Sequence, residues 1–214
     1  MTTTQRTPEW FTARLGLLTA SCASAMLATV KVGEAAARRD LRTQLVLERL
    51  TGQPQEDGFV SKDMQRGADL EADAFTAYEA LTGNLAMPCG FLAHDTLMAG
   101  CSPDGLVDGS KGGLELKVPK SATHLGYLRA GTMPSAYVAQ VTHSLWITGA
   151  EWWDFLSFDP RFPASLQTFY VRVQRQDVGL SAYEAAVKTF LAEVDKEYNE
   201  LAAMAEKAAA TRAA

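Results

Sequence analysis

Two short segments constrain the fold of this chain more than any other part of it. They are the Ser-Pro-Asp-Gly sequence at 102–105 and the Leu-Glu-Leu-Lys sequence at 114–117. In a β-strand, side chains alternate between faces, so the two leucines point into a core while Glu115 and Lys117 share the opposite face. The proline fixes one backbone angle and the glycine permits an unusual one, which favours a turn at Asp104. A hairpin that closes between the segments brings Asp104, Glu115 and Lys117 to one place.

Two carboxylates beside an ammonium group suit a particular chemistry. Carboxylate oxygens hold Mg²⁺ or Mn²⁺, and such an ion activates water against a phosphodiester. The same residues have a simpler interpretation, because Glu and Lys two positions apart are common as a solvated pair on the wet face of a sheet. An Asp-Gly dipeptide is likewise common as a plain turn. The spacing that lets one hairpin close favours the metal site.

Length and composition are those of one substantial domain. The chain has 214 residues, of which 47% are hydrophobic and 21% charged, so we expect a single α/β domain over residues 1–214. Its cysteines and histidines are scattered, without the spacing of zinc or iron–sulfur ligands. These residues are Cys22, Cys89, Cys101, His94, His124 and His143. The cysteines are expected to be small buried side chains in a reducing compartment.

The sequence shows no membrane or export segment. No run of apolar residues is long enough to cross a bilayer, and residues 1–6 are polar and lack the apolar segment of a secretory signal. We therefore expect a cytoplasmic protein without a membrane partner.

Charge is distributed unevenly along the chain. The net charge of −5 is unusual for a protein that contacts phosphates, which are normally neutralised by Lys and Arg. Basic residues gather in the N-terminal third and acidic residues near the C-terminus. The basic group is Lys31, Arg38, Arg39, Arg42 and Arg49, and the acidic group is Glu193, Asp195, Glu197, Glu200 and Glu206. We expect a basic surface that faces nucleic acid and an acidic outer face, because the local field matters more than the total charge.

Apolar periodicity predicts the order of helices and strands. Helices are expected over 34–50, 64–81, 136–147 and 181–207, the last with Ser181 as its N-cap and with a frayed tail over 208–214. Strands are expected at about 86–93, 97–101, 113–118, 152–158 and 167–173. This order predicts an α/β fold with a mixed central β-sheet flanked by helices.

Further polar residues have positions that suit a metal or phosphate site. Glu71 lies in the middle of a predicted helix, and Gln140 lies within an otherwise apolar one. Arg14 precedes Thr19 and Ser21, and an arginine with hydroxyls and free N–H groups at a helix start binds anions. Each residue also has an ordinary interpretation, as a surface glutamate, a satisfied amide or a helix cap.

Several motifs follow one another in a definite order along the chain. They are Glu9-Trp10-Phe11 with residues 14–21, Arg66-Gly67 with Glu71, the segments 101–105, 113–117 and 135–141, and the aromatic strand 152–155 with Asp159-Pro160-Arg161. This series resembles the YqaJ-type viral recombinase family of the PD-(D/E)XK nuclease superfamily. The resemblance covers nearly the whole chain, from about residue 9 to the C-terminal helix.

The resemblance implies a restriction-endonuclease-like (PD-(D/E)XK) core. It also implies a Mg²⁺-dependent 5′→3′ exonuclease, with Mn²⁺ as a substitute, that binds double-stranded DNA ends and degrades one strand to 5′-mononucleotides. The family further implies a homotrimeric ring, a 3′ tail handed to a single-strand annealing protein for recombination, and a phage or prophage gene in a bacterial host. Two alternatives stay open: an endonuclease of restriction or repair type with this fold, and a DNA-end-binding module without chemistry.

The same resemblance assigns roles at the catalytic core. The ligands of two metal ions would be Asp104, Glu115, the main-chain carbonyl of Leu116 and, for the second ion, Glu71. Lys117 would orient or deprotonate the attacking water and offset charge on the phosphorus. Gln140 would steady Lys117 or the nucleophile.

The resemblance also assigns residues that contact the DNA end. The pocket for the terminal 5′-phosphate would consist of Arg14, Thr19, Ser21 and Ser102. Met64 stands where the family places an apolar wedge, although an ordinary core or surface methionine is an equal alternative. Lys120 is the nearest candidate for DNA contacts from the segment after Lys117, where an arginine of the family has no counterpart. The four tryptophans are expected in core or subunit packing rather than on DNA.

Overall fold

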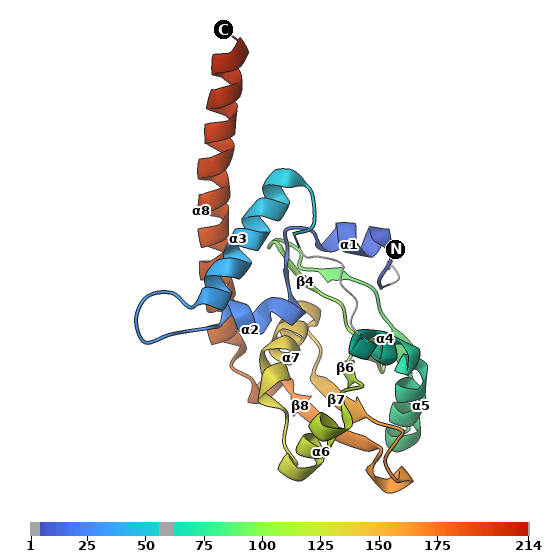
Figure 1. Ribbon diagram of the computed structural model, residues 1–214. Helices are drawn as coiled ribbons and strands as arrows, with labels where there is room; N and C mark the ends of the chain where they lie inside the picture. Colours follow the sequence, from blue (N-terminus) through green and yellow to red (C-terminus); the bar gives the residue numbers. More distant parts are fainter. Residues whose placement is uncertain (1–4, 56–61, 214) are drawn as a thin grey trace.

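The computed structural model describes residues 5–55 and 62–213, arranged around two β-sheets (Figure 1). The larger sheet has five strands in the order β2-β5-β6-β7-β8. Strands β6 and β7 run parallel, and the other neighbours are antiparallel, so the predicted mixed sheet is confirmed. Its strands are β2 (Ala86–Pro88), β5 (Gly105–Val107), β6 (Gly112–Lys117), β7 (Trp152–Phe158) and β8 (Thr168–Gln174).

The smaller sheet has three strands in the order β1-β4-β3. Its strands are β1 (Leu18–Thr19), β4 (Ala99–Cys101) and β3 (Leu92–Ala93). The single strand predicted over 86–93 is therefore wrong, because that segment contributes β2 to one sheet and β3 to the other. Pro88 ends β2, consistent with its lack of a backbone N–H for continued pairing.

Eight α-helices flank the sheets in the described part of the chain. They are α1 (Pro8–Arg14), α2 (Ala23–Met26), α3 (Ala36–Thr51), α4 (Lys62–Asp69), α5 (Glu71–Thr82), α6 (Ser121–Ala130), α7 (Ser135–Thr148) and α8 (Leu180–Ala213). Short 3₁₀ segments cover 20–22, 164–166 and 175–177. The helix predicted over 64–81 is divided, because the backbone of Leu70 leaves helical geometry between α4 and α5. Helix α6 was not predicted, since its sequence contains an internal glycine and little apolar periodicity.

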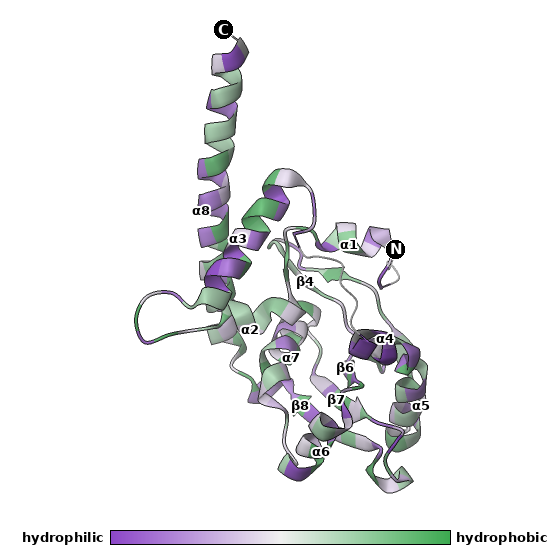
Figure 2. Cartoon of the chain, in the orientation of Figure 1, coloured by the Kyte–Doolittle hydropathy of each residue, from purple (hydrophilic) through white to green (hydrophobic). Residues whose placement is uncertain are grey.

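Helix α8 is longer than the sequence predicted. It begins at Leu180, so Ser181 lies inside the first turn, and it continues to Ala213. The helix thus includes most of the segment that was expected to fray, consistent with the high helix propensity of alanine. The second half of α8 extends away from the rest of the protein (Figure 1), and hydrophilic and hydrophobic residues alternate along it (Figure 2).

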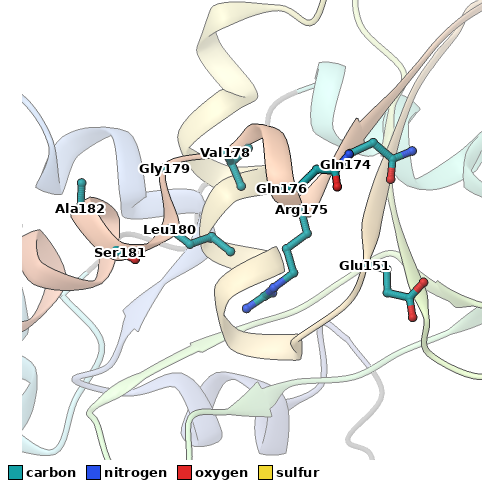
Figure 3. A pocket seen from close by; sticks show the side chains of 9 residues that line it. All are labelled: Glu151, Gln174, Arg175, Gln176, Val178, Gly179, Leu180, Ser181 and Ala182. Atoms are coloured by element: carbon teal, nitrogen blue, oxygen red, sulfur yellow. The ribbon is translucent and has the colours of Figure 1, made fainter.

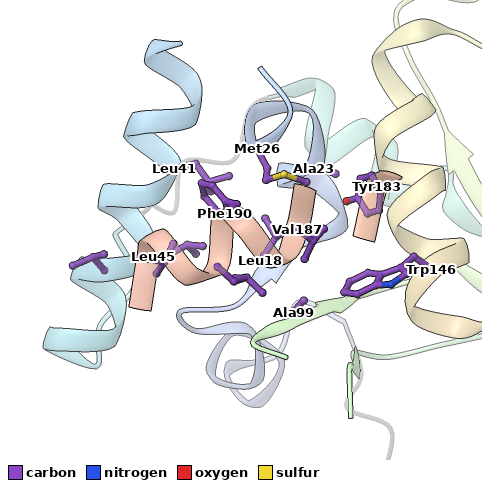
Figure 4. Packing of buried hydrophobic residues seen from close by; sticks show 13 residues of the cluster. Leu18, Ala23, Met26, Leu41, Leu45, Ala99, Trp146, Tyr183, Val187 and Phe190 are labelled. Atoms are coloured by element: carbon purple, nitrogen blue, oxygen red, sulfur yellow. The ribbon is translucent and has the colours of Figure 1, made fainter. Parts of the chain in front are cut away.

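The main apolar core lies between α2, α3, α7, α8 and the small sheet. Leu18, Val187 and Phe190 are fully buried there, and Trp146 covers one side (Figure 4). A second cluster packs α5 against the large sheet and includes Leu114 of β6. Burial on one face of β6 thus fixes which residues occupy the other face.

The aromatic and cysteine side chains are largely internal. Trp10, Trp146 and Trp153 are buried, as are Cys89 and Cys101, whereas Trp152 and Cys22 are half-buried. Trp153 packs directly on β6, where a Cβ placed on Gly113 would lie 2.2 Å from its ring. Only glycine allows the two strands to enclose this indole.

The expected separation of basic and acidic surfaces is not what the fold produces. Three arginines of α3 form ion pairs with acidic residues of α8, so the two charged groups neutralise each other. The pairs are Arg38 with Glu193 at 2.7 Å, Arg42 with Glu197 at 3.0 Å and Arg49 with Asp195 at 2.6 Å. These partly exposed pairs contribute little stability, about 0–1 kcal/mol each, but they reduce the charge that α3 could offer to a phosphate.

None of the helices within residues 5–55 and 62–213 combines the length and the apolar composition needed to cross a membrane.

His143 joins three parts of the fold at one buried point. Its Nδ1 lies 2.6 Å from the hydroxyl of Tyr183 in α8, and its Nε2 lies 3.1 Å from the carbonyl oxygen of Gly100 in β4. A neutral ring satisfies both contacts when Nε2 donates and Nδ1 accepts. Burial lowers the pKa of His143 from 6.5 to about 4.

We expect this histidine to make stability depend on pH. The unfolded chain takes up its proton near pH 6.5 and the folded chain near pH 4, so unfolding becomes easier as the pH falls between these values. Over that range the free energy of unfolding should fall by about 3 kcal/mol more in the wild type than in His143→Gln. Urea unfolding at a series of pH values measures the difference, and equal pH dependence in the two proteins would contradict it.

Candidate active site

The hairpin of β5 and β6 brings Asp104 beside the middle of β6, as the sequence predicted. The backbone N–H of Asp104 donates to the carbonyl oxygen of Leu114 at 3.1 Å, and its Oδ2 accepts from the N–H of Leu116 at 2.6 Å. The predicted turn at Asp104-Gly105 is wrong, however, because Gly105 is the first residue of β5. The reversal occurs at 108–111, where Asp108, Gly109 and Ser110 all have positive φ.

Glu115 lies on the opposite face of β6 from the apolar cluster and is only 3% exposed. It forms an ion pair with Lys117. Gln140 of α7 donates from Nε2 to Oε1 of Glu115 at 2.7 Å. The interpretation of Glu115 and Lys117 as a solvated pair is therefore wrong. The Gln140 amide stabilises the carboxylate that the lysine also contacts.

Burial and neighbouring charges shift the pKa values of Asp104 and Lys117. Burial and the charge of Glu115 raise the pKa of Asp104 above its ordinary value, although Lys117 and the N–H of Leu116 act in the other direction. Burial alone would lower the pKa of Lys117, but Glu115 and Asp104 raise it above its ordinary value. The lysine is consequently an ammonium ion, held between carboxylates that repel each other.

Tyr137 is a neighbour of Lys117 that the sequence did not single out. Its ring centroid lies 5.1 Å from the Lys117 ammonium and 5.1 Å from the ring of Phe155. An aromatic face attracts a cation, so Tyr137 restricts where the ammonium group lies. The available signal was its position three residues before Gln140, because residues at this spacing share one face of a helix.

Glu71 stands apart from Asp104 and Glu115, which we call the acidic pair. It is the first residue of α5 rather than a mid-helix residue, and its carboxylate pairs with Arg6 at 2.9 Å. It remains close enough to raise the pKa of Asp104. Across residues 5–55 and 62–213, no group of three or more His, Cys, Asp or Glu has the spacing of a metal site. The fold therefore gathers two of the three predicted carboxylates.

The four residues predicted to bind a phosphate are linked through Trp10. The guanidinium of Arg14 lies 3.8 Å from the Trp10 ring centroid, and the indole N–H of Trp10 donates to the Ser102 hydroxyl at 2.9 Å. Arg14 also donates to Thr19 at 3.5 Å, and the hydroxyls of Thr19 and Ser21 are 3.1 Å apart. Trp10 was expected only in packing. Its position four residues before Arg14, on the same face of α1, was the signal for this role.

This polar group adjoins the acidic pair. Ser102 lies two residues before Asp104 in the chain. Between them, the carbonyl oxygen of Pro103 accepts from Gln5 Nε2 at 2.7 Å, which holds the N-terminal segment against the same strand connection. The predicted phosphate-binding residues and Asp104 are therefore connected through the segment 102–104.

The two remaining predicted contacts lie around α4. Lys120 directly precedes α6, is 72% exposed, and pairs with Asp63 of α4 at 3.1 Å. The backbone of Met64 belongs to α4, but its side chain lies outside the part that the structure describes. Helix α4 is strongly hydrophilic (Figure 2), which is unlike a helix that packs into a core.

A surface pocket at the connection from β8 to α8 contains none of the predicted site residues. It is lined by Glu151 and by residues from 174–182 (Figure 3). Its one arginine, Arg175, donates from Nη1 to the carbonyl oxygens of Leu145 and Ala150. That guanidinium stabilises the end of α7 and the loop after it, so the pocket offers little positive charge to a ligand.

The donor set of the acidic pair fits a small divalent cation. Carboxylate oxygens are the ligands that Mg²⁺ prefers, and this ion is usually held by one or two carboxylates with water completing the shell. A cation would also relieve the repulsion that raises the pKa of Asp104. A cation held by two carboxylates beside a fixed ammonium group would be suited to polarise water against a phosphodiester.

Comparisons with known proteins identify relatives of this chain. The model of the YqaJ-like viral recombinase domain matches residues 9–151. The putative uncharacterized protein ExoD of Escherichia coli (strain K12) is 31% identical over 67 residues, which are 31% of this chain and 76% of that protein. The family model covers both the N-terminal motif and the catalytic-core motifs.

Solved structures extend the likeness over almost the whole chain. The crystal structure of LHK-Exo, an alkaline exonuclease from Laribacter hongkongensis, has a TM-score of 0.84 and 36% identity over 94% of this chain and 99% of that one. A complex of LHK-Exo with dAMP gives a TM-score of 0.85 with the same identity and coverage.

A phage-related exonuclease from Haemophilus somnus 129PT shares the fold, with a TM-score of 0.64 and 14% identity over 88% of this chain and 96% of that one. The predicted PD-(D/E)XK-type fold is thereby confirmed. The chain belongs to the YqaJ-like viral recombinase family.

Proposed function

We propose that the protein is a Mg²⁺-dependent nuclease that degrades one strand of linear double-stranded DNA from its 5′ end. The products would be 5′-mononucleotides and a 3′ single-stranded tail. Family membership and the likeness to an alkaline exonuclease support a nuclease. The observation that carries the proposal is the buried Glu115, paired with Lys117 and adjacent to Asp104.

We assign the roles of the core residues as the family resemblance implies them. Asp104 and Glu115 would hold the metal ions together with the carbonyl of Leu116, and Glu71 would reach a second ion through water. Bound ions supply a polarised water and stabilise charge on the leaving 3′-oxygen. Gln140 keeps the Glu115 carboxylate in place through its 2.7 Å hydrogen bond.

Lys117 would act as a cation. Its pKa is raised by Glu115 and Asp104, so it is suited to orient the attacking water and offset negative charge at the phosphorus. Proton acceptance by Lys117 is disfavoured for the same reason. Tyr137 limits the directions in which its ammonium group can move.

The pocket around Arg14 would set the direction of cleavage. A terminal 5′-phosphate carries more charge than an internal phosphodiester and completes contacts with the guanidinium and three hydroxyls. Trp10 holds Arg14 and Ser102 in one arrangement. We extend the proposal to a homotrimeric ring at the DNA end and to a single-strand annealing protein that receives the 3′ tail.

We expect Lys117→Ala to abolish cleavage, with a loss of about 10³-fold or more because the transition-state charge loses its cation. Wild-type protein with Mg²⁺ should convert 5′-phosphorylated linear duplex to mononucleotides and a 3′ tail, and leave closed circular DNA intact. Lys111→Ala, at an exposed lysine in the turn of the same hairpin, is the matched control and should retain activity. Nicking of circles would favour the endonuclease, and end binding without cleavage the non-catalytic module.

Asp104→Asn tests the metal site without a turnover assay. The amide removes a charge that burial and Glu115 disfavour, so the metal-free variant should melt at a higher temperature than the wild type, by roughly 3 °C or more at pH 8. The gain should shrink as the pH falls and Asp104 becomes protonated in the wild type. Added Mg²⁺ should raise the melting temperature of the wild type but not of the variant.

Asp108→Asn, an exposed position in the hairpin turn, is the control for that experiment and should respond to Mg²⁺ as the wild type does. A wild-type melting temperature that is indifferent to Mg²⁺ and Mn²⁺ would refute the metal site.

Arg14→Ala should remove the preference for a phosphorylated 5′ end. Loss of a charge-assisted contact of about 1.5–3 kcal/mol corresponds to a reduction of roughly 10- to 100-fold in that preference. Competition between phosphorylated and hydroxyl-terminated duplexes measures it, with Arg39→Ala on the exposed face of α3 as control. Equal digestion of both ends by the wild type would count against the pocket.

A further inference from the structure

A second charged cluster lies at the edge of the sheet that carries Lys117. Strands β6 and β7 are parallel, and Lys117 is paired in register with Ser157. The C-terminal ends of both strands therefore lie at the same edge of the sheet. Asp159 follows Ser157 by two residues and is fully buried at this edge.

Asp159 holds Arg161 in a fixed orientation. Nε and Nη2 of Arg161 donate to the two carboxylate oxygens at 2.7 and 2.8 Å, and the backbone N–H of Arg161 donates to Oδ1 at 3.1 Å. Ser121 donates to Oδ2 at 2.7 Å. Burial alone would raise the pKa of Asp159, but the hydrogen bonds from Arg161 and Ser121 lower it below its ordinary value. The carboxylate is a permanent anion that positions the guanidinium.

Arg66 connects the cluster of Asp159 and Arg161, which we call the Asp159 corner, to the residues directly after Lys117. Its Nη2 lies 3.3 Å from Asp159, and its Nη1 donates to the carbonyl oxygens of Pro119 at 2.9 Å and Val118 at 3.4 Å. Helix α4, the end of β6 and the end of β7 are thus joined by one side chain. Any ligand held at this corner would lie on the same edge of the sheet as Lys117.

Asp159 has two arginine partners, Arg66 and Arg161, although one cation is enough to neutralise its charge. Arg66 is the more buried of the two, whereas 51% of the Arg161 side chain is exposed. Among the described residues, Nη1 of Arg161 has no hydrogen-bond partner. A guanidinium that is fixed by two bonds on one side and open on the other is preorganised to bind an anion.

Around Asp159, cations outnumber carboxylates, unlike the basic residues of α3. With Lys120 the Asp159 corner contains three cations, against the two carboxylates Asp159 and Asp63. The α3 arginines, in contrast, are engaged by α8. In a chain of net charge −5, this local excess of positive charge beside the catalytic edge is suited to a polyanion.

We propose that Arg161, positioned by Asp159, contacts the phosphodiester backbone of the duplex that enters the active site. The inference rests on the proposed function and adds a DNA contact to it. Arg161 binds a backbone phosphate through Nη1 and contributes to holding the duplex, while Arg66 keeps the corner aligned with Lys117.

The test measures DNA binding without cleavage. Fluorescence anisotropy with a 5′-phosphorylated linear duplex in EDTA, over a series of KCl concentrations, gives the slope of log K against log salt. Arg161→Ala should weaken binding by about 5- to 20-fold at low salt and lower the magnitude of the slope by about 0.9, the value for one phosphate contact. Arg161→Lys should retain the slope but bind more weakly than the wild type, because an ammonium group lacks the fork that Asp159 holds.

Arg129→Ala, an exposed arginine at the end of α6, is the matched control and should leave both quantities unchanged. A lower melting temperature of Arg161→Ala with a wild-type slope would show that Arg161 only holds its turn, and would overturn the inference. Failure of the wild type to cleave linear duplex with Mg²⁺ would refute the proposed function instead. Cleavage by the wild type together with a wild-type slope in Arg161→Ala would refute this inference alone.

Discussion

Glu115 is a carboxylate inside the fold, and the rest of the site is arranged around it. A buried carboxylate costs free energy unless it is paired and hydrogen-bonded. Here Lys117 supplies the opposite charge from the same strand, and Gln140 supplies an N–H from α7. Helix α7 is in turn held to the small sheet and to α8 through His143. The position of this one carboxylate therefore depends on contacts among four elements.

Buried carboxylates recur as positioning groups in this protein. Asp154, in the middle of β7, accepts hydrogen bonds from Tyr78, Tyr170 and Arg172, and Asp159 organises the end of the same strand. Asp104 differs, because its surroundings raise its pKa. A carboxyl group whose surroundings raise its pKa is more typical of a functional site than of a structural network, which distinguishes Asp104 from Asp159.

Much of the fold could be predicted from local patterns. The strand over 152–158 has the predicted bounds, because a short run rich in aromatic residues favours a strand over a helix. The predicted hairpin also formed, although its turn lies at 108–111 rather than at Asp104. The strand over 86–93 was misjudged, because its first part pairs with β5 in the large sheet and its last part with β4 in the small sheet. Pro88, at the end of the first part, was a local signal for the break, but local sequence does not indicate which sheet each part joins.

The sequence by itself determined the apolar face of β6 and the shared position of Glu115 and Lys117, because these follow from residues a few positions apart. Tertiary structure alone decided that Gln140 reaches Glu115 across 25 positions and that Trp10 reaches Ser102 across 92. It also turned the α3 arginines toward α8 and left Arg161 open at the catalytic edge. Such pairings depend on how distant elements pack, and no periodicity along the chain encodes which side chains then meet.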